Sequence, residues 1–117
     1  MTKIEKIYPE QKLDTKVTPT AFIVRATDEP EPMDRHEAME AFDNNPDSEW
    51  RLPTRGELLI MYENKEEIGG FEESWIYWSS SEDDSDTAWV QRFGDGFQHN
   101  APTLNRHLVR LVRKEIK

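Results

Sequence analysis

Hydrophobic and polar positions along the chain follow two patterns, and the first of them predicts short strands. Runs rich in β-branched and aromatic residues, bounded by turn-forming residues, are typical of strands. Runs of this character occur at residues 20–26, 74–81, 87–93 and 106–113. Gly94-Asp95-Gly96 follows the third run and is a hairpin signal. We therefore expect the second half of the chain to be a meander of short strands, with residues 97–105 irregular.

The second pattern is the 3.6-residue spacing of amphipathic helices, which two segments show. In the first, residues 33–45, the apolar stripe consists of Ala38, Ala41 and Phe42. Asp34 and Glu37 have the spacing of a capping box, with Asp in place of the more usual Ser or Thr. These positions predict a helix that begins at residue 34.

The stretch WRLPT, residues 50–54, leads into the second predicted helix. Thr54 and Glu57 have the T-x-x-E spacing of a capping box, and the preceding proline favours an extended approach. The apolar face of this helix consists of Leu58, Met61 and Tyr62. In the lead-in, Trp50 and Leu52 alternate with a polar residue, so we expect both apolar side chains to point inward.

Length and the N-terminal segment indicate one domain. The chain has 117 residues, which is the usual size of a single domain. Residues 1–16 are polar and mixed in charge, and we expect them to form an N-terminal arm or edge strand, with residues 17–117 as the domain proper. No apolar run approaches the ~20 residues that span a membrane, and no secretory leader is recognisable. We expect no membrane partner and a cytoplasmic location.

Composition adds that the chain is strongly acidic, with 24 Asp and Glu residues against 15 Lys and Arg residues and a net charge of −9. Phosphate backbones attract basic proteins, so we expect no direct nucleic-acid partner. Acidic surfaces are steered toward basic ones, which favours a basic protein surface as partner, although such a charge also serves solubility alone. Cysteine is absent, which excludes disulfides, thiolate metal sites and a cysteine nucleophile.

Candidate chemistry in the sequence is sparse. The acidic tract at residues 82–86 has carboxylates of the type that bind Ca²⁺, but its spacing does not match a D-x-D-x-D-G loop, so we favour a solvated loop tip. His36, His99 and His107 lack metal-ligand spacing. Neither a nucleophile elbow nor a phosphate-binding glycine loop is present. We therefore expect no enzyme activity, no metal and no cofactor.

Several motifs in a fixed order resemble the Lcl C-terminal-type domain, a family common in bacteria and phages. They are W-R-L-P-T-x-x-E-L, Y-W-S-S-S, an aromatic–valine strand, a glycine turn and V-R-x-V-R, and the resemblance covers residues 33–113. The positions that carry it are Trp50, Arg51, Pro53, Thr54, Glu57, Tyr77, Trp78, Trp89, Arg110 and Arg113.

The resemblance implies a C-type-lectin-like α+β fold, in which two helices pack on a small twisted antiparallel sheet and long loops present a binding surface. Similar folds occur in the formylglycine-generating enzyme and in variable receptor-binding proteins of phages. The enzyme needs cysteines, which this chain lacks. The thin polar set near the C-terminus, which includes Asn100 and Asn105, does not support diversification of the phage type.

We interpret the motif residues as mainly structural. The tryptophans expected in the core are Trp50, Trp78 and Trp89. Arg110 and Arg113 lie three residues apart, so on a strand they face opposite sides. We hypothesise that one of the two arginines is buried against Glu57 or another carboxylate, because a buried guanidinium is best paired.

Loops at residues 64–74, 82–87 and 94–106 are expected to form the contact surface of a non-enzymatic protein-binding module, encoded by a phage or prophage. Aromatic anchors dominate interface energetics, and acidic residues would line the rim. The candidate binding residues are Glu72, Glu73, Trp75, Asp83, Asp84, Asp86, Phe97, His99 and Asn100.

Two alternatives to this function remain open at the level of sequence. One is an acidic anti-defence inhibitor that blocks a host nucleic-acid-binding complex by occupying a groove for phosphates. Clustering of Glu66, Glu67, Glu72 and Glu73 with Asp83 and Asp84 on one face would support that hypothesis, and their dispersal would weaken it. The other is a phage adhesion or receptor-binding component of the virion.

Overall fold

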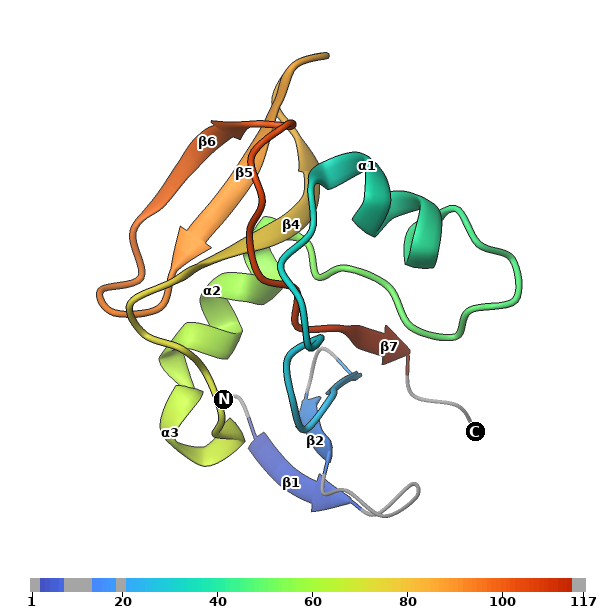
Figure 1. The fold of residues 1–117 in the computed structure, drawn as a ribbon. Helices are drawn as coiled ribbons and strands as arrows, with labels where there is room; N and C mark the ends of the chain where they lie inside the picture. Colours follow the sequence, from blue (N-terminus) through green and yellow to red (C-terminus); the bar gives the residue numbers. More distant parts are fainter. Residues whose placement is uncertain (1–2, 8–13, 19–20, 115–117) are drawn as a thin grey trace.

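The computed structural model describes residues 3–7, 14–18 and 21–114, which form a mixed α+β domain (Figure 1). The described part contains two small antiparallel sheets, with strand orders β1-β2-β3-β7 and β4-β5-β6. The strands are β1 (Lys3–Ile7), β2 (Asp14–Thr18), β3 (Phe22–Val24), β4 (Ile76–Glu82), β5 (Thr87–Arg92), β6 (Gln98–Pro102) and β7 (Val112–Lys114). The helical segments are α1 (Arg35–Ala38), the π-helical η1 (Met39–Asp43), α2 (Arg55–Glu63) and α3 (Lys65–Ile68).

The first sheet joins segments from both ends of the chain. β1 is its edge strand and pairs with β2, while β3 pairs with β7, which comes from the C-terminal segment. Val17, Phe22, Val24 and Val112 from three neighbouring strands all belong to one core cluster. Residues 8–13, which fall in the predicted N-terminal segment, lie outside the described residues.

Capping boxes begin the two main helical segments, as the sequence predicted. The Asp34 carboxylate accepts from the Glu37 backbone N–H at 2.9 Å, and the Glu37 carboxylate accepts from the Asp34 N–H at 3.0 Å. Thr54 and Glu57 make the same reciprocal pair at 3.1 and 2.9 Å. Each box satisfies two backbone donors that the first helical turn leaves without a partner. Both predicted helix starts are therefore confirmed.

The first helical segment is shorter and less regular than predicted. It runs over α1 and η1, from Arg35 to Asp43, and not to residue 45. Its second half is a π-helical turn closed by the Asn44 N–H, which donates to the Met39 carbonyl at 2.8 Å. Of the predicted apolar stripe, Ala38 is fully buried and Phe42 is half-buried against the same cluster, but Ala41 is exposed, so its place in the stripe is wrong.

The second sheet confirms the predicted meander and extends it. β4 pairs with β5, and β5 pairs with β6, which lies within residues 97–105. The prediction of an irregular segment there is therefore wrong. Pairs such as Val90 with His99 and Ala88 with Ala101 hold the polar segment in the sheet. Pro102 is tolerated because it is the last residue of an edge strand, where no ladder donor is needed.

The prediction of a final strand over residues 106–113 is also wrong in its extent. The regular strand in this segment is β7, and only isolated bridges precede it. The segment before β7 crosses from one sheet to the other and changes its backbone partners as it goes (Figure 1). Leu108 bonds to β4, the Val109 carbonyl accepts from Glu29, and the Leu111 carbonyl accepts from Arg25. A segment that exchanges partners at each step cannot form a regular ladder.

Adjacent residues of β4 serve two different core clusters, because successive side chains of a strand point to opposite faces. Tyr77 packs in the cluster with Leu58 and Met61 from α2. Trp78 packs in the other cluster with Leu52 and Leu111, beside α1. β4 therefore lies between the two core clusters and contributes side chains to both. Within the described residues, no helix is both long and apolar enough to cross a membrane.

Candidate functional site

Two exposed aromatic side chains lie at one end of the second sheet. Trp75, just before β4, is 47% exposed, and Phe97, just before β6, is 55% exposed. Arg92 connects them, since it pairs with Ile76, the residue after Trp75, and its N–H donates to the Phe97 carbonyl at 3.0 Å. We call Trp75, Arg92, Phe97 and His99 the aromatic end.

Three side chains of the aromatic end, those of Arg92, Phe97 and His99, contact one another. The Phe97 ring stacks on His99 at 5.5 Å between centroids, and the Arg92 guanidinium lies 5.8 Å from the Phe97 centroid. Arg92 also holds Asp95 through two hydrogen bonds of 3.1 and 2.7 Å. These bonds and the Phe97 N–H lower the pKa of Asp95 to about 2. The turn between β5 and β6, which includes Asp95 and Phe97, is therefore held to the end of β5 by Arg92.

Carboxylates flank the aromatic end on the loop before β4. Glu73 pairs with Lys65 at 2.9 Å, which raises the pKa of that lysine, while Glu72 is exposed. The loop lies directly on the β5–β6 turn, because a Cβ at Gly94 would come within 2.8 Å of the Glu73 carbonyl oxygen. The structure thus brings Glu72, Glu73, Trp75, Phe97 and His99 of the predicted set to one end of the sheet.

The other predicted binding residues lie at the opposite end of the sheet and serve the β4–β5 turn. Asp84 accepts from the N–H groups of Asp86 and Thr87, which lowers the pKa of its carboxyl group. Asp83 accepts from the Thr87 hydroxyl at 3.0 Å and from the Asn100 amide at 2.7 Å. These hydrogen bonds hold the β4–β5 turn in its conformation, so the acidic residues there have a structural role within the turn.

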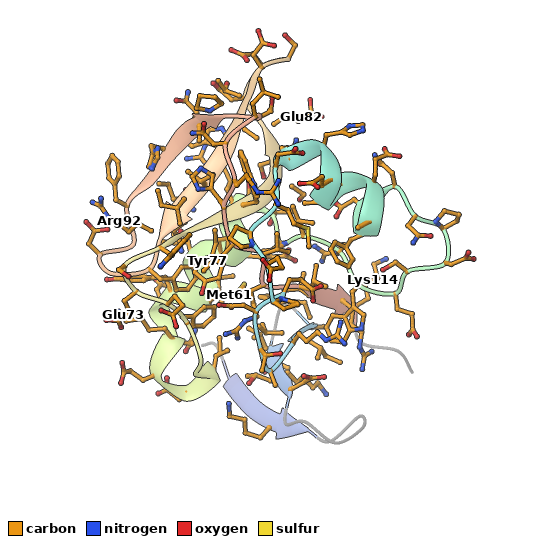
Figure 2. The ribbon with its side chains drawn as sticks, in the orientation of Figure 1. Met61, Glu73, Tyr77, Glu82, Arg92 and Lys114 are labelled. Carbon is orange, nitrogen blue, oxygen red and sulfur yellow. The ribbon has the colours of Figure 1, made fainter. Side chains whose placement is uncertain are left out.

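The structure therefore does not bring the two acidic groups together. β4 is seven residues long, about 20 Å of extended chain, and separates the Glu72–Glu73 loop from the turn at Asp83. Figure 2 shows Glu73 and Glu82 far apart at the two ends of this strand. The clustering that the inhibitor hypothesis required is not present among these residues.

Arg51 and Glu57, two of the motif residues, form a fork-to-fork pair. Two guanidinium nitrogens of Arg51 donate to the two Glu57 oxygens at 2.8 and 2.9 Å. Burial alone would raise the pKa of Glu57, but the hydrogen bonds from Arg51 and Thr54 lower it overall. The same carboxylate caps α2, so this pair fixes the WRLPT lead-in on the helix that follows.

Arg110 confirms the hypothesis of a buried arginine held by a carboxylate, and the carboxylate is Asp28. Arg110 is fully buried and donates from Nε to Asp28 at 2.7 Å, with further bonds to the carbonyls of Arg25 and Gly69. Tyr77 donates to the other Asp28 oxygen at 2.7 Å, and burial raises the pKa of its hydroxyl. The sequence could not distinguish Asp28 from Glu57 as the partner.

The prediction for the tryptophans holds fully for one of three. Trp78 is fully buried, and its Nε1 donates to the Met33 carbonyl at 2.8 Å. Trp50 is half-buried and packs against the cluster that contains Trp78, so its prediction holds only in part, whereas Trp89 is half-buried and its placement in the core is wrong. Guanidinium groups lie over their rings: Arg25 and Arg113 over Trp50 at 4.8 and 5.2 Å, and Arg55 over Trp89 at 3.5 Å. Long cationic side chains cover these rings where the core does not reach.

The sequence-based predictions did not include two structurally important arginines, Arg92 at the aromatic end and the buried Arg35. The hairpin signal after β5 could have indicated Arg92, because a residue before a tight turn lies opposite the residue after it. Nothing in the sequence marks Arg35, which begins a short helix and is 6% exposed. Within the described residues, no group of three His, Asp or Glu side chains is placed to hold a metal ion.

The fold and these side chains define a small α+β domain with an aromatic end and a buried arginine network. The sequence profile of the Lcl C-terminal domain matches residues 14–113, and the chain belongs to this family. The resemblance of the ordered motifs is thereby confirmed. A comparison with curated proteins finds no match to the chain.

Proposed function

We propose that this protein is a non-enzymatic protein-binding module that contacts its partner through the aromatic end. The exposure of Trp75 and Phe97 carries the proposal, because large aromatic side chains half open to water are the usual anchors of interfaces. Arg92 and His99 hold Phe97 in place, so little side-chain freedom is lost on binding.

We further propose that the domain has a C-type-lectin-like fold. Short helices on small antiparallel sheets, with the N- and C-terminal strands in one sheet, support this assignment. The loop before β4 and the turn between β5 and β6 would then present the binding surface. In this frame the aromatic end is a loop surface held by a rigid sheet.

The charge around the aromatic end supports a basic partner surface. Glu66, Glu67 and Glu72 are exposed on α3 and the loop that follows it. Glu73 and Asp95 are already paired with Lys65 and Arg92, so the surplus charge of this region is negative. Acidic surfaces raise the association rate with basic ones, and the effect falls as salt rises.

The acidic anti-defence inhibitor is the weaker candidate. It requires a continuous row of carboxylates, and the two acidic groups lie at opposite ends of β4. The carboxylates of Asp83 and Asp84 are engaged in the β4–β5 turn. The proposed partner is a protein in the cytoplasm of a bacterial host that binds the aromatic end. Such binding requires neither a continuous row of carboxylates nor free carboxylates at the β4–β5 turn.

Affinity capture from bacterial lysate tests the proposal when wild type is compared with the double variant Trp75→Ala/Phe97→Ala. Both side chains are exposed, so the fold should survive the change. The matched control is Leu104→Ala, which removes an 86% exposed apolar side chain just after β6, beyond the end of that strand that lies away from Phe97. We expect a partner that wild type and the control capture and the double variant loses.

Nuclease treatment of the lysate separates this outcome from binding through nucleic acid. A partner that disappears after nuclease treatment, or that the double variant retains, would contradict the proposal. Neutralisation by Glu72→Gln should weaken capture at low salt and have little effect at high salt, because exposed charges are screened there.

A further inference from the structure

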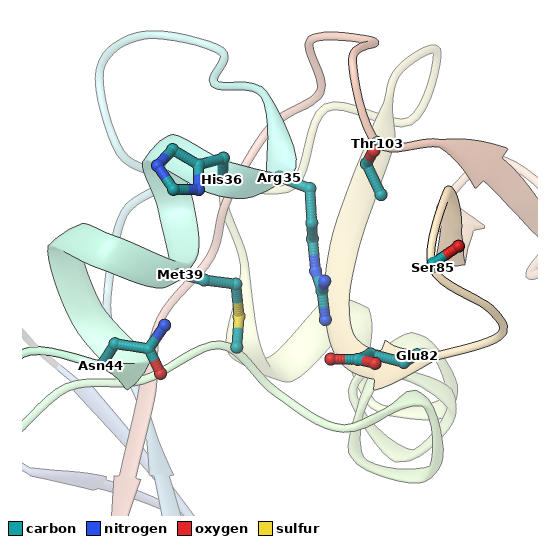
Figure 3. Close-up of a pocket in the computed structure, with 7 residues that line it drawn as sticks. All are labelled: Arg35, His36, Met39, Asn44, Glu82, Ser85 and Thr103. Atoms are coloured by element: carbon teal, nitrogen blue, oxygen red, sulfur yellow. The ribbon is translucent and has the colours of Figure 1, made fainter.

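A pocket of about 320 Å³ lies between the α1–η1 segment, the β4–β5 hairpin and the end of β6 (Figure 3). Its volume is at the lower end of the range for small-molecule sites. Arg35 and Glu82 supply one positive and one negative charge, and Met39 supplies apolar surface. The remaining lining residues are His36, Asn44, Ser85 and Thr103.

Arg35 is a fixed part of this pocket. The residue is 6% exposed, and its side chain donates from Nε to the Ser79 carbonyl at 3.2 Å and from Nη2 to the Ser80 carbonyl at 2.8 Å. These bonds anchor one edge of the guanidinium to β4. Figure 3 shows the end of the side chain pointing into the pocket toward Glu82. Among the described residues, Nη1 has no hydrogen-bond partner, so it can donate to a ligand.

The pairing of Arg35 differs from that of two other arginines in the described part of the chain. Arg51 is paired with Glu57, and the fully buried Arg110 is paired with Asp28. Among the described residues, no carboxylate comes within 4.0 Å of Arg35, and burial lowers its pKa despite the nearby charges of Glu82 and Asp43. A buried cation without a close anion is costly unless something else compensates it.

Other lining groups are similarly open to a ligand. Within the described residues, the side chains of Glu82, Ser85, Thr103 and His36 form no hydrogen bond. The neighbouring Asp83 behaves differently, since it accepts two hydrogen bonds within the β4–β5 hairpin and from β6. The pocket thus combines a fixed cation, an open carboxylate and several unused polar groups.

We propose that this pocket binds a free α-amino acid, with the carboxylate of the ligand on Arg35 and its ammonium group on Glu82. An anion alone would be repelled by Glu82, and a cation alone would be repelled by Arg35. A zwitterion satisfies both charges, and a guanidinium is well shaped to hold a carboxylate. Met39 then contacts the ligand side chain, and the proposal is independent of the protein-binding surface at the aromatic end.

Titration of the labelled protein with the common L-amino acids, followed by heteronuclear NMR, tests this proposal. At least one of them should give saturable shifts at the amides of residues 35–39 and 82–85. The best binder is then compared with its N-acetyl and its amide derivatives, which lack the ammonium and the carboxylate charge. Each derivative should bind at least about tenfold more weakly, since each loses one charged contact.

Glu82→Gln is the decisive variant, because Glu82 is exposed and its loss should leave the fold intact. It should weaken zwitterion binding about tenfold and leave binding of the N-acetyl form unchanged or stronger. The control Glu66→Gln, on α3 and outside the pocket, should bind as wild type does. The proposal is overturned if no amino acid gives saturable shifts, if the derivatives bind equally well, or if Glu82→Gln binds like the control.

Discussion

Arg110 links its own segment to two others that are distant in the sequence, residues 25–28 and 69–71. Its guanidinium donates to Asp28, to the Arg25 carbonyl and to the Gly69 carbonyl, and it lies 4.1 Å from the Phe71 centroid. These acceptors lie in different directions, which suits a planar fork with several donors and not a single ammonium group. The arginine therefore holds the loops around β4 by geometry as well as by charge.

Replacement of this arginine by lysine tests the role of the fork. Arg110→Lys should lower the free energy of unfolding by about 2 kcal/mol, because the charge remains but several buried acceptors lose their donors. The matched control is Arg113→Lys, at the half-buried arginine over Trp50, where the loss should be below about 1 kcal/mol. Urea denaturation measures both. Equal midpoints for the two variants would contradict the role assigned to Arg110.

His107 gives the fold a pH dependence of defined sign. Burial, with a smaller effect of His99, lowers the pKa of the imidazole, whose ring packs against Trp78 at 4.9 Å. Its buried Nε2 has no hydrogen-bond partner among the described residues. The unfolded chain therefore takes up a proton at higher pH than the folded protein does. Stability should fall as the pH drops below the unfolded value of about 6.5.

The measurement is the unfolding free energy at about pH 7.5 and about pH 5.5, above the range where paired carboxylates titrate. His107→Phe keeps an aromatic ring against Trp78 and removes the titrating group, so the loss of stability over this interval should shrink. His36→Gln, at an exposed histidine, should leave the loss as in wild type. An unchanged pH dependence in His107→Phe would show that another group is responsible.

At the scale of elements, the helix starts are the features that the sequence predicted best. A capping box involves residues three apart, so its partners are visible in the sequence itself. The strands β4 and β5 were also predictable, because the run of β-branched and aromatic residues that marks each strand is local in the sequence. β6 was missed because its polar residues show no strand pattern, and its pairing with β5 alone makes it a strand.

Removal of the α2 cap should have a measurable cost. Thr54→Ala removes the acceptor for the Glu57 N–H and should lower the unfolding free energy by about 1 kcal/mol. Thr54→Ser keeps the acceptor and should restore most of that loss. Thermal unfolding of the three proteins checks the prediction. A melting temperature of the alanine variant equal to that of wild type would mean that the Arg51–Glu57 pair alone sets the helix start.

At the scale of the whole molecule, distant residues determine what the sequence could not show. Arg110 and Asp28 are 82 positions apart, and no local pattern selects Asp28 over other carboxylates. Trp50 and Trp89 are half-buried because the two cores end beneath them, and arginines cover the rings instead. The candidate binding residues divide between two ends of a sheet for a similar reason, since the direction of β4 carries Glu73 and Asp83 apart.

Under the proposed function, the uneven distribution of charge matters for how a basic partner would approach the aromatic end. The exposed glutamates on α3 and the loop after it lie on the side of the molecule that carries Trp75. Arginines cluster instead around Trp50, near the first sheet. Under the proposed function, a basic partner would be attracted to the aromatic end more than to the arginines around Trp50.

Calorimetric affinity of the purified partner for wild type and for Trp75→Ala/Phe97→Ala tests the proposed protein-binding function most directly. If the aromatic end is the interface, the double variant should bind at least about 30-fold more weakly, as expected for loss of a principal anchor. Leu104→Ala should bind with the affinity of wild type. Equal affinities of the double variant and wild type would show that the partner binds elsewhere on the molecule.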